Sequence, residues 1–198
     1  MRLKIDGTFT TLGDVYRDNG LEFFLDKLTG LTGFEIEKYF VIDVADFAPL
    51  VNILGGVDFY VPEDMEYSDP SQSLEIDLKK GKQYINGERA QQLLRYNNYS
   101  DSSNSREKTT CDFIFALADK ISDASYIKKA SSLFTAFEDY ITTNYTLDDL
   151  ADNLDMMSHY KVFEKITYSY PGKNVTVGKT KYFDPDIKEA IGEYAKYR

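Results

Sequence analysis

The feature that most constrains the fold is the alternation of helical and strand patterns along the chain. The stretch 10–30 predicts two helical pieces, and Gly30 is a natural stop for the second. One apolar face of that second piece is formed by Leu21, Phe24, Leu25 and Leu28. The run EKYFVIDV at 37–44 is dense in β-forming residues, and LEIDL at 74–78 alternates apolar and polar positions, so both predict strands. This alternation predicts an α/β fold with three αβα layers, in which helices cover both faces of a central mixed sheet.

Capping residues locate the starts of several helices. Asn86 precedes the run GERAQQLLRY, and Thr146 followed by Asp149 resembles a capping box. Asp184, which is followed by proline, predicts a further helix start near the end of the sequence. Ser105 is the predicted cap of a helix whose apolar stripe is Phe113, Ile114, Leu117 and Ile121.

The length and the even composition predict one domain over residues 1–198. No linker-like shift in composition and no internal repeat divides the 198 residues, a number that suits one domain. Two irregular segments, 62–73 and 96–104, interrupt the pattern. Long loops in compact domains often carry function, so both segments are candidates for a binding site.

The charge excludes some classes of partner. The sequence has 23 basic and 33 acidic residues, which gives a net charge of −10. This balance disfavours nucleic acid, because neutralising phosphates requires a basic surface. It also disfavours attachment to an anionic membrane through a basic patch. No apolar run approaches the roughly 20 residues of a membrane span, and no signal-peptide pattern is present.

Most residues that commonly carry chemistry have a simpler explanation here. His159 is the only histidine and Cys111 the only cysteine, so a zinc site is not expected, and each is assigned a structural role. No phosphate-binding glycine motif is present. The acidic pairs at 63–64 and 148–149 could bind a divalent ion, but a solvated loop and the first turn of a helix explain them equally well.

Two arginines flank the polar stretch RYNNYSDSSNSRE at 95–107. Arg95 ends one predicted helix and Arg106 begins the next. Guanidinium groups that converge at a helix N-terminus form a natural site for an anion, above all phosphate. Neutral donors could come from nearby hydroxyls, those of Ser100, Ser102, Ser103 and Ser105. The alternative is that both arginines cap helix ends or pair with surface carboxylates.

The order of segments resembles the LytR-CpsA-Psr family. The resemblance rests on VIDVADFAPLVNILGGVDFYVPEDMEYSD, then LEIDLKKGKQYINGERAQQLLRY, then a polar loop, an arginine and an apolar helix, and it covers roughly residues 20 to 190. It implies an αβα domain that transfers cell-wall glycopolymers, such as teichoic acid or capsule, from a polyprenyl-pyrophosphate carrier to peptidoglycan. It also implies an arginine cluster and Mg²⁺ that hold the pyrophosphate, and a hydrophobic tunnel for the lipid. The family usually stands outside the cell, behind one N-terminal membrane helix.

The family's arginine loop is depleted in this sequence. The family's first arginine falls on Arg95 and a later one on Arg106, which the resemblance therefore implies as catalytic residues. The second arginine of the family pattern falls on Asn97. Its aspartate falls on Ser103, with Asp101 the nearest acid, so these two are implied as weaker phosphate-binding residues.

The last arginine–glutamine pair of the family pattern is also replaced. It falls on Thr109 and Thr110, and Lys108 is the nearest cation. An ammonium group cannot grip phosphate with two parallel hydrogen bonds, so Lys108 is implied as a partial substitute. The upstream strand with the family's metal-binding aspartate has no counterpart here, so no Mg²⁺ ligand is assigned. The sequence is expected to lack the family's N-terminal strands and membrane anchor.

Three functions are compatible with these residues. The first is a phosphotransferase in which Arg95 and Arg106 neutralise the leaving phosphate. The second is a catalytically impaired member that binds lipid-linked phosphate or glycan, or that partners an active paralogue. The third, transcriptional regulation, is disfavoured by the net charge of −10 and the absence of a helix-turn-helix pattern.

Overall fold

The computed structural model describes residues 1–5, 7–101 and 103–197, and these residues form two compact units. The first unit combines Met1–Glu37 with Tyr168–Arg198, and the second unit is Lys38–Thr167. Each unit is described by itself below. That residues 1–198 act as one domain stays a prediction.

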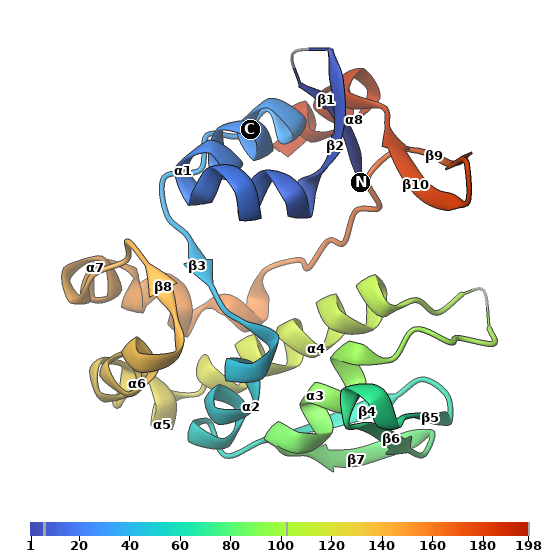
Figure 1. Ribbon diagram of the computed structural model, residues 1–198. Helices are drawn as coiled ribbons and strands as arrows, with labels where there is room; N and C mark the ends of the chain where they lie inside the picture. The colour runs from blue at the N-terminus through green and yellow to red at the C-terminus, as the bar shows by residue number, and fades with distance from the viewer. Residues whose placement is uncertain (6, 102, 198) are drawn as a thin grey trace. The chain divides into compact units, whose positions relative to one another are not determined.

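The first unit contains two hairpins and two longer helices (Figure 1). Its elements are β1 (Arg2–Ile5), β2 (Thr8–Thr11), α1 (Leu12–Thr32), β9 (Gly172–Val177), β10 (Thr180–Pro185), α8 (Ile187–Tyr194) and the 3₁₀ turn η4 (Ala195–Tyr197). Its small core holds the buried side chains of Leu3, Val15 and Leu31. The Arg2 guanidinium donates two hydrogen bonds to Asp184, of 2.7 and 2.6 Å, which tie β1 to β10.

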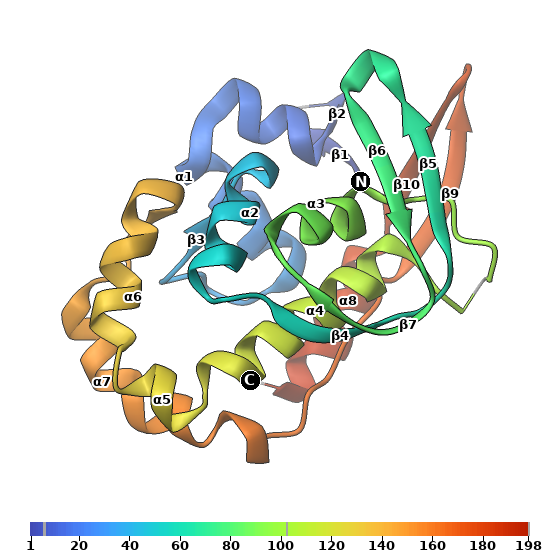
Figure 2. The same cartoon turned by 90° about the horizontal axis from the view of Figure 1, so that it is seen from below.

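The second unit carries the polar stretch and most of the buried residues. Its strands are β3 (Phe40–Val41), β4 (Val57–Val61), β5 (Met65–Asp69), β6 (Leu74–Leu78), β7 (Gly81–Ile85) and β8 (Thr142–Thr143). Its helices are α2 (Val44–Ile53), α3 (Gly87–Arg95), α4 (Arg106–Ile121), α5 (Ala124–Ile127), α6 (Ala130–Phe137) and α7 (Leu147–Ser158). Short 3₁₀ turns are η1 (Pro70–Gln72), η2 (Glu138–Tyr140) and η3 (Tyr160–Val162). Helices α3 and α4 lie side by side, with β4 and β7 against them (Figure 2).

The strands pair differently from the prediction. Among the described residues they form five separate two-stranded antiparallel sheets, rather than one central mixed sheet. The β4–β7 pair shows the physical reason, because Val57, Phe59 and Val61 are buried while the alternate Tyr60 is 59% exposed. One solvated face is typical of antiparallel strands, whereas a central strand of an αβα sandwich is covered on both faces. The predicted mixture of helices and strands is confirmed.

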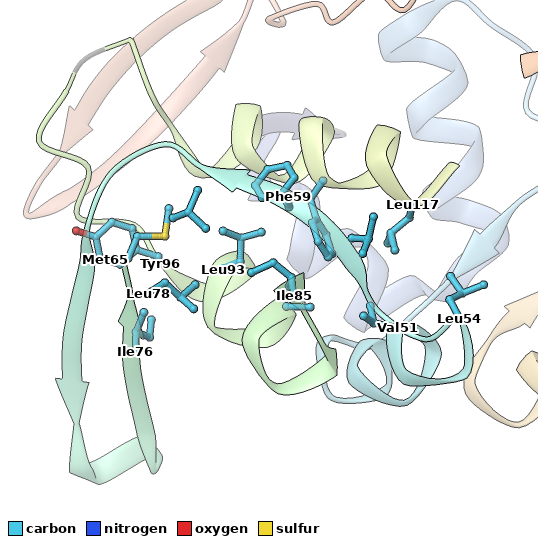
Figure 3. Packing of buried hydrophobic residues seen from close by; sticks show 14 residues of the cluster. Val51, Leu54, Phe59, Met65, Ile76, Leu78, Ile85, Leu93, Tyr96 and Leu117 are labelled. Carbon is cyan, nitrogen blue, oxygen red and sulfur yellow. The ribbon is translucent and has the colours of Figure 1, made fainter. Parts of the chain in front are cut away.

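The core of the second unit lies between α3, α4 and the β4–β7 strands. Phe113 of α4 is fully buried, and its ring meets that of Phe59 edge to face, with centroids 5.3 Å apart. Figure 3 shows Phe59, Leu93 and Leu117 converging in this space from β4, α3 and α4. This packing joins α3, whose last residue is Arg95, to α4, whose first residue is Arg106.

Local capping follows the sequence closely. The Asn86 and Ser105 side chains accept hydrogen bonds from backbone amides in the first turns of α3 and α4, and Thr146 with Asp149 forms a complete capping box. Two predicted boundaries were wrong. Helix α1 continues past Gly30 and ends at Gly33, whose φ of 71° suits glycine. The start of α8 is capped by Asp186, because the residues before it complete strand β10.

The contact between α2 and α3 depends on a glycine. The Gly87 amide donates a 2.9 Å hydrogen bond to Asn52 Oδ1, and a Cβ at Gly87 would overlap the Ala48 carbonyl oxygen. We expect Gly87→Ala to lower the free energy of unfolding by about 1–3 kcal/mol, because the two helices must move apart. Urea unfolding followed by circular dichroism measures this change. Glu88→Ala, at the exposed neighbouring position, is the control, and equal stability of the two variants would contradict the prediction.

Candidate functional site

Arg95 is held at the C-terminal end of α3. The helix is anchored to α2 by the Gln91 side chain, whose amide donates to the backbone oxygens of Val44 and Ala45 at 3.2 and 3.0 Å. The half-buried Arg95 places its Nη2 3.3 Å from Gln72 Oε1, a long hydrogen bond. Gln72 in turn donates to Asp69 at 2.6 Å. A neutral partner at this distance leaves most of the guanidinium free for an anion.

Arg106 begins α4 and is exposed. The helix start is fixed by Ser105, whose Oγ accepts a 3.1 Å hydrogen bond from the Lys108 amide. The nearest acidic group to Arg106 in the described part of the chain is Glu107, with 3.8 Å between Nη2 and Oε1. That separation exceeds a hydrogen bond and both side chains are exposed, so the pair is weak. Among the described residues, neither arginine thus forms a close ion pair, although Arg95 does lie in the last turn of α3, as the helix-end alternative expects.

Both arginines line one cavity of about 820 Å³. Its wall is completed by residues of α2, α3, the β5–β6 hairpin and the polar stretch: Val44, Ala45, Tyr67, Gln72, Leu74, Gln91, Leu94, Asn97 and Asn98. We call this space the arginine cavity. Two cations among amide, hydroxyl and short apolar groups suit a ligand that carries both anionic and polar groups. What Arg95 and Arg106 bind stays a prediction.

The weaker predicted residues lie elsewhere. Asp101, Ser103 and Lys108 line a second polar cavity of about 440 Å³, together with Phe59, Tyr60, Pro62, Lys80, Asn104, Thr109 and Asp112. The Lys108 ammonium is neutralised by Asp112 at 2.9 Å. The Asp101 carboxylate accepts the amide of Ser103 at 2.9 Å, and this bond lowers the pKa of Asp101. The structure therefore does not bring these three residues into the cavity with the arginines.

Serine hydroxyls of the polar stretch already form hydrogen bonds within the protein. Ser105 caps α4 and the Ser100 hydroxyl bonds to Glu63 at 3.3 Å, while Ser102 lies outside the described residues. The amide side chains that line the arginine cavity belong to Gln72, Gln91, Asn97 and Asn98, and those of Gln72 and Gln91 already donate to Asp69 and to the start of α2. Sequence reasoning missed Tyr67 and Gln72, because it treated 62–73 as irregular. That segment contains β5 and η1, which present both residues to the cavity.

Glu63 is buried rather than solvated, which corrects the interpretation of the 63–64 pair as a surface loop. Its side chain is 8% exposed and accepts hydrogen bonds from Ser100, Asp101 and Asn104. Burial alone would raise the pKa of Glu63, but these hydrogen bonds to its charged form hold the pKa below the ordinary value. No sequence signal marked this residue, since its partners lie 37 to 41 positions away.

A third cavity is apolar and, like the arginine cavity, is lined in part by helix α2. It has a volume of about 420 Å³. Its lining is almost wholly apolar and includes Phe47, Leu50, Leu117, Phe134, Phe137 and Leu150. Val44 and Ala45 at the start of α2 line the arginine cavity, while Phe47 and Leu50 further along line this one. Helix α2 thus lines both the arginine cavity and the apolar cavity.

The remaining predicted roles are structural. His159 ends α7, where its Nδ1 lies 2.8 Å from the Asp155 carbonyl oxygen. Cys111 is half-buried on α4. The Asp148–Asp149 pair belongs to the first turn of α7, where Asp149 bonds to Lys38 at 2.7 Å and to Thr146. The hydrogen bond from Lys38 is the main reason that the pKa of Asp149 falls to about 2.

Within the described ranges, no group of three or more acidic, histidine or cysteine side chains is placed to hold a metal ion. No ligand is therefore assigned to the Mg²⁺ that the family resemblance implies. Among the same residues, no helix is both long enough and apolar enough to cross a membrane.

The chain belongs to the LytR_cpsA_psr family, which it matches over residues 1–194. It is 28% identical over 207 residues to the polyisoprenyl-teichoic acid–peptidoglycan teichoic acid transferase TagV of Bacillus subtilis (strain 168). That alignment covers 96% of this chain and 51% of TagV, so the chain spans about half the length of this curated relative.

Two solved structures share the fold. The crystal structure of B. subtilis TagV superposes with a TM-score of 0.80 at 24% identity, over 99% of this chain and 79% of the crystallised TagV chain. TagT bound to LI-WTA superposes with a TM-score of 0.69 at 15% identity, over 96% of this chain and 72% of that chain. The LytR-CpsA-Psr-like fold predicted from the sequence is therefore confirmed.

Proposed function

We propose that this chain acts in the transfer of a cell-wall glycopolymer, of the teichoic acid or capsule kind, from a polyprenyl-pyrophosphate carrier to peptidoglycan. The observation that carries the proposal is that Arg95 and Arg106 line one cavity, beside an apolar cavity that shares helix α2. A lipid pyrophosphate has the two matching parts, an anionic head and an apolar chain. The transferase name of TagV and the LI-WTA bound to TagT support the same class of substrate.

In this proposal the arginines neutralise the pyrophosphate. Two guanidinium groups stabilise the negative charge that builds up on the leaving phosphate, which is the main contribution that proteins make to such reactions. The half-buried Arg95 also orients the head group, while the exposed Arg106 meets it from the start of α4. The apolar cavity holds part of the lipid chain. The protein would work at the outer face of the membrane, where carrier and peptidoglycan meet.

Mg²⁺ is part of the family's chemistry, and the described residues offer no cluster for it. No step is therefore assigned to the metal. The alternative, a member that binds carrier or glycan without transferring it, is not favoured, since the curated relative TagV is named as a teichoic acid transferase.

The test compares three ligands that differ only in their head group: farnesyl pyrophosphate, farnesyl monophosphate and farnesol. Calorimetric titration, with and without Mg²⁺, should show the pyrophosphate binding at least about tenfold more tightly than farnesol, because each charged hydrogen bond contributes about 1.5–3 kcal/mol. Equal affinity for all three would show that only the apolar cavity binds, and would overturn the proposal. Transfer from a lipid-pyrophosphate glycan donor then tests the reaction itself.

A further inference from the structure

Glu63 is an unusual acidic residue in this chain. It lies in the short turn between β4 and β5, and it is the one charged side chain found buried among the described residues. Burying a carboxylate is costly unless hydrogen bonds replace its water. The neighbouring Asp64 is exposed, so the turn does not force both side chains inward.

All the hydrogen bonds to Glu63 among the described residues come from the segment between α3 and α4, residues 96–101 and 103–105, which we call the arginine loop. Its Oε1 accepts from the Ser100 amide at 2.8 Å and from the Ser100 hydroxyl at 3.3 Å. Its Oε2 accepts from the Asp101 amide at 3.4 Å and from Asn104 Nδ2 at 3.3 Å. One carboxylate thus accepts hydrogen bonds from two backbone amides of a loop whose described residues form no helix or strand.

The donors on Glu63 are all neutral. No ion pair to Glu63 is found in the described part of the chain, so the carboxylate is held by loop groups alone. A buried charge that depends on one set of donors strongly disfavours any conformation that removes them. Glu63 therefore stabilises the one conformation of the loop that supplies these donors.

The loop also has an anchor at its other end. Tyr96 is buried, its hydroxyl donates to the Asn98 carbonyl oxygen at 2.9 Å, and its ring meets that of Tyr99 edge to face at 5.1 Å. This aromatic pair fixes the part of the loop that follows Arg95. Glu63 fixes the part that precedes Arg106. Tyr96 and Glu63 thus hold the loop at two points along the segment that joins Arg95 to Arg106.

We propose that Glu63 is a positioning residue, which holds the arginine loop in the conformation that places Arg95 and Arg106 in one cavity. The effect of Glu63 on ligand binding rests on the proposed function. The effect of Glu63 on the loop conformation does not depend on that function, so the loop and the ligand binding can be tested separately.

The main variant is Glu63→Gln, which keeps the size of the side chain. It replaces one acceptor oxygen by an NH₂ group that would face the donors of the loop. We expect hydrogen exchange at the Ser100 and Asp101 amides, measured without ligand, to accelerate at least about tenfold. We expect farnesyl pyrophosphate to bind about tenfold more weakly and farnesol to bind as before. A purely structural role would not separate these two ligands.

The matched control is Glu75→Gln, at an exposed position of β6, which should change neither quantity. Asn104→Ala removes one of the hydrogen-bond donors to Glu63. It should also speed amide exchange in the loop and weaken farnesyl pyrophosphate binding, by smaller factors than Glu63→Gln. It also keeps the test available if Glu63→Gln does not fold.

Three results decide the matter. Unchanged exchange in the loop of Glu63→Gln and Asn104→Ala would overturn the proposal. Faster exchange with unchanged pyrophosphate affinity would overturn the positioning role. If the unmodified protein binds farnesyl pyrophosphate no better than farnesol, the proposed function fails, and the exchange rates alone then decide whether Glu63 holds the loop.

Discussion

Replacing Arg95 and Arg106 together by alanine is expected to weaken the binding of farnesyl pyrophosphate at least about 100-fold. Each guanidinium is expected to contribute a charged hydrogen bond of about 1.5–3 kcal/mol, and about 1.4 kcal/mol corresponds to a factor of ten. Farnesol affinity should not change, since the apolar cavity contains neither arginine. Calorimetric titration of the single and double variants measures the effect.

Two controls separate this prediction from a general loss of positive charge. Arg89→Ala removes an arginine of the same helix that bonds to Gln83 and lies outside the arginine cavity. Lys108→Ala removes a cation that pairs with Asp112 beside the other polar cavity. Both variants should bind farnesyl pyrophosphate with an affinity within about twofold of that of the unmodified protein. If Lys108→Ala weakens binding as much as Arg106→Ala, the anion does not bind in the arginine cavity alone, which contradicts the prediction.

The single variants carry further information. When two residues hold the same group, the effects of their single substitutions do not add. We therefore expect the loss of binding free energy in the double variant to differ from the sum of the losses in the two single variants. Strict additivity would indicate that Arg95 and Arg106 contact separate parts of the ligand.

Phe113→Ala is expected to lower the free energy of unfolding of the second unit by about 3–5 kcal/mol. The ring is fully buried and contacts Phe59 at 5.3 Å and Phe47 at 6.2 Å between ring centroids. Truncation leaves a cavity in the core that joins α4 to β4. Urea unfolding followed by circular dichroism measures the loss.

Ile114→Ala is the matched control, since Ile114 is the next residue of α4 and is 48% exposed. It should change stability by less than about 1 kcal/mol. A similar loss for both variants would mean that the burial pattern of α4 is not as described. The Phe113 variant should also bind farnesyl pyrophosphate more weakly, because α4 carries Arg106.

Features that depend on neighbouring residues were predictable from the sequence. The caps Asn86, Ser105 and Thr146 act on amides three positions away, so the pattern of side chains was sufficient. The two helical pieces of α1 were predicted as well, because Gly20, with a φ of 80°, breaks the helix where the apolar face begins. Gly30 misled the prediction because a glycine can stay inside a helix when apolar residues continue beyond it.

Features that depend on distant residues were not predictable. Strand β3 pairs with β8 across about a hundred positions, at Phe40 and Thr143, and no local pattern encodes that choice. The same holds for Glu63, whose character as a buried acceptor depends on a loop 37 positions away. The arginines themselves were found from the sequence, whereas Gln72, which contacts Arg95, lies 23 positions away in η1.

The most direct test of the central claim is to observe both arginine side chains while a pyrophosphate binds. In ¹⁵N-labelled protein, the Nε–Hε signals of Arg95 and Arg106 can be assigned with the lysine variants of each and followed during titration with farnesyl pyrophosphate. Our account predicts that both signals shift with one shared dissociation constant, while that of Arg89 stays in place. If the ligand saturates and neither Arg95 nor Arg106 responds, the two arginines do not form the pyrophosphate site.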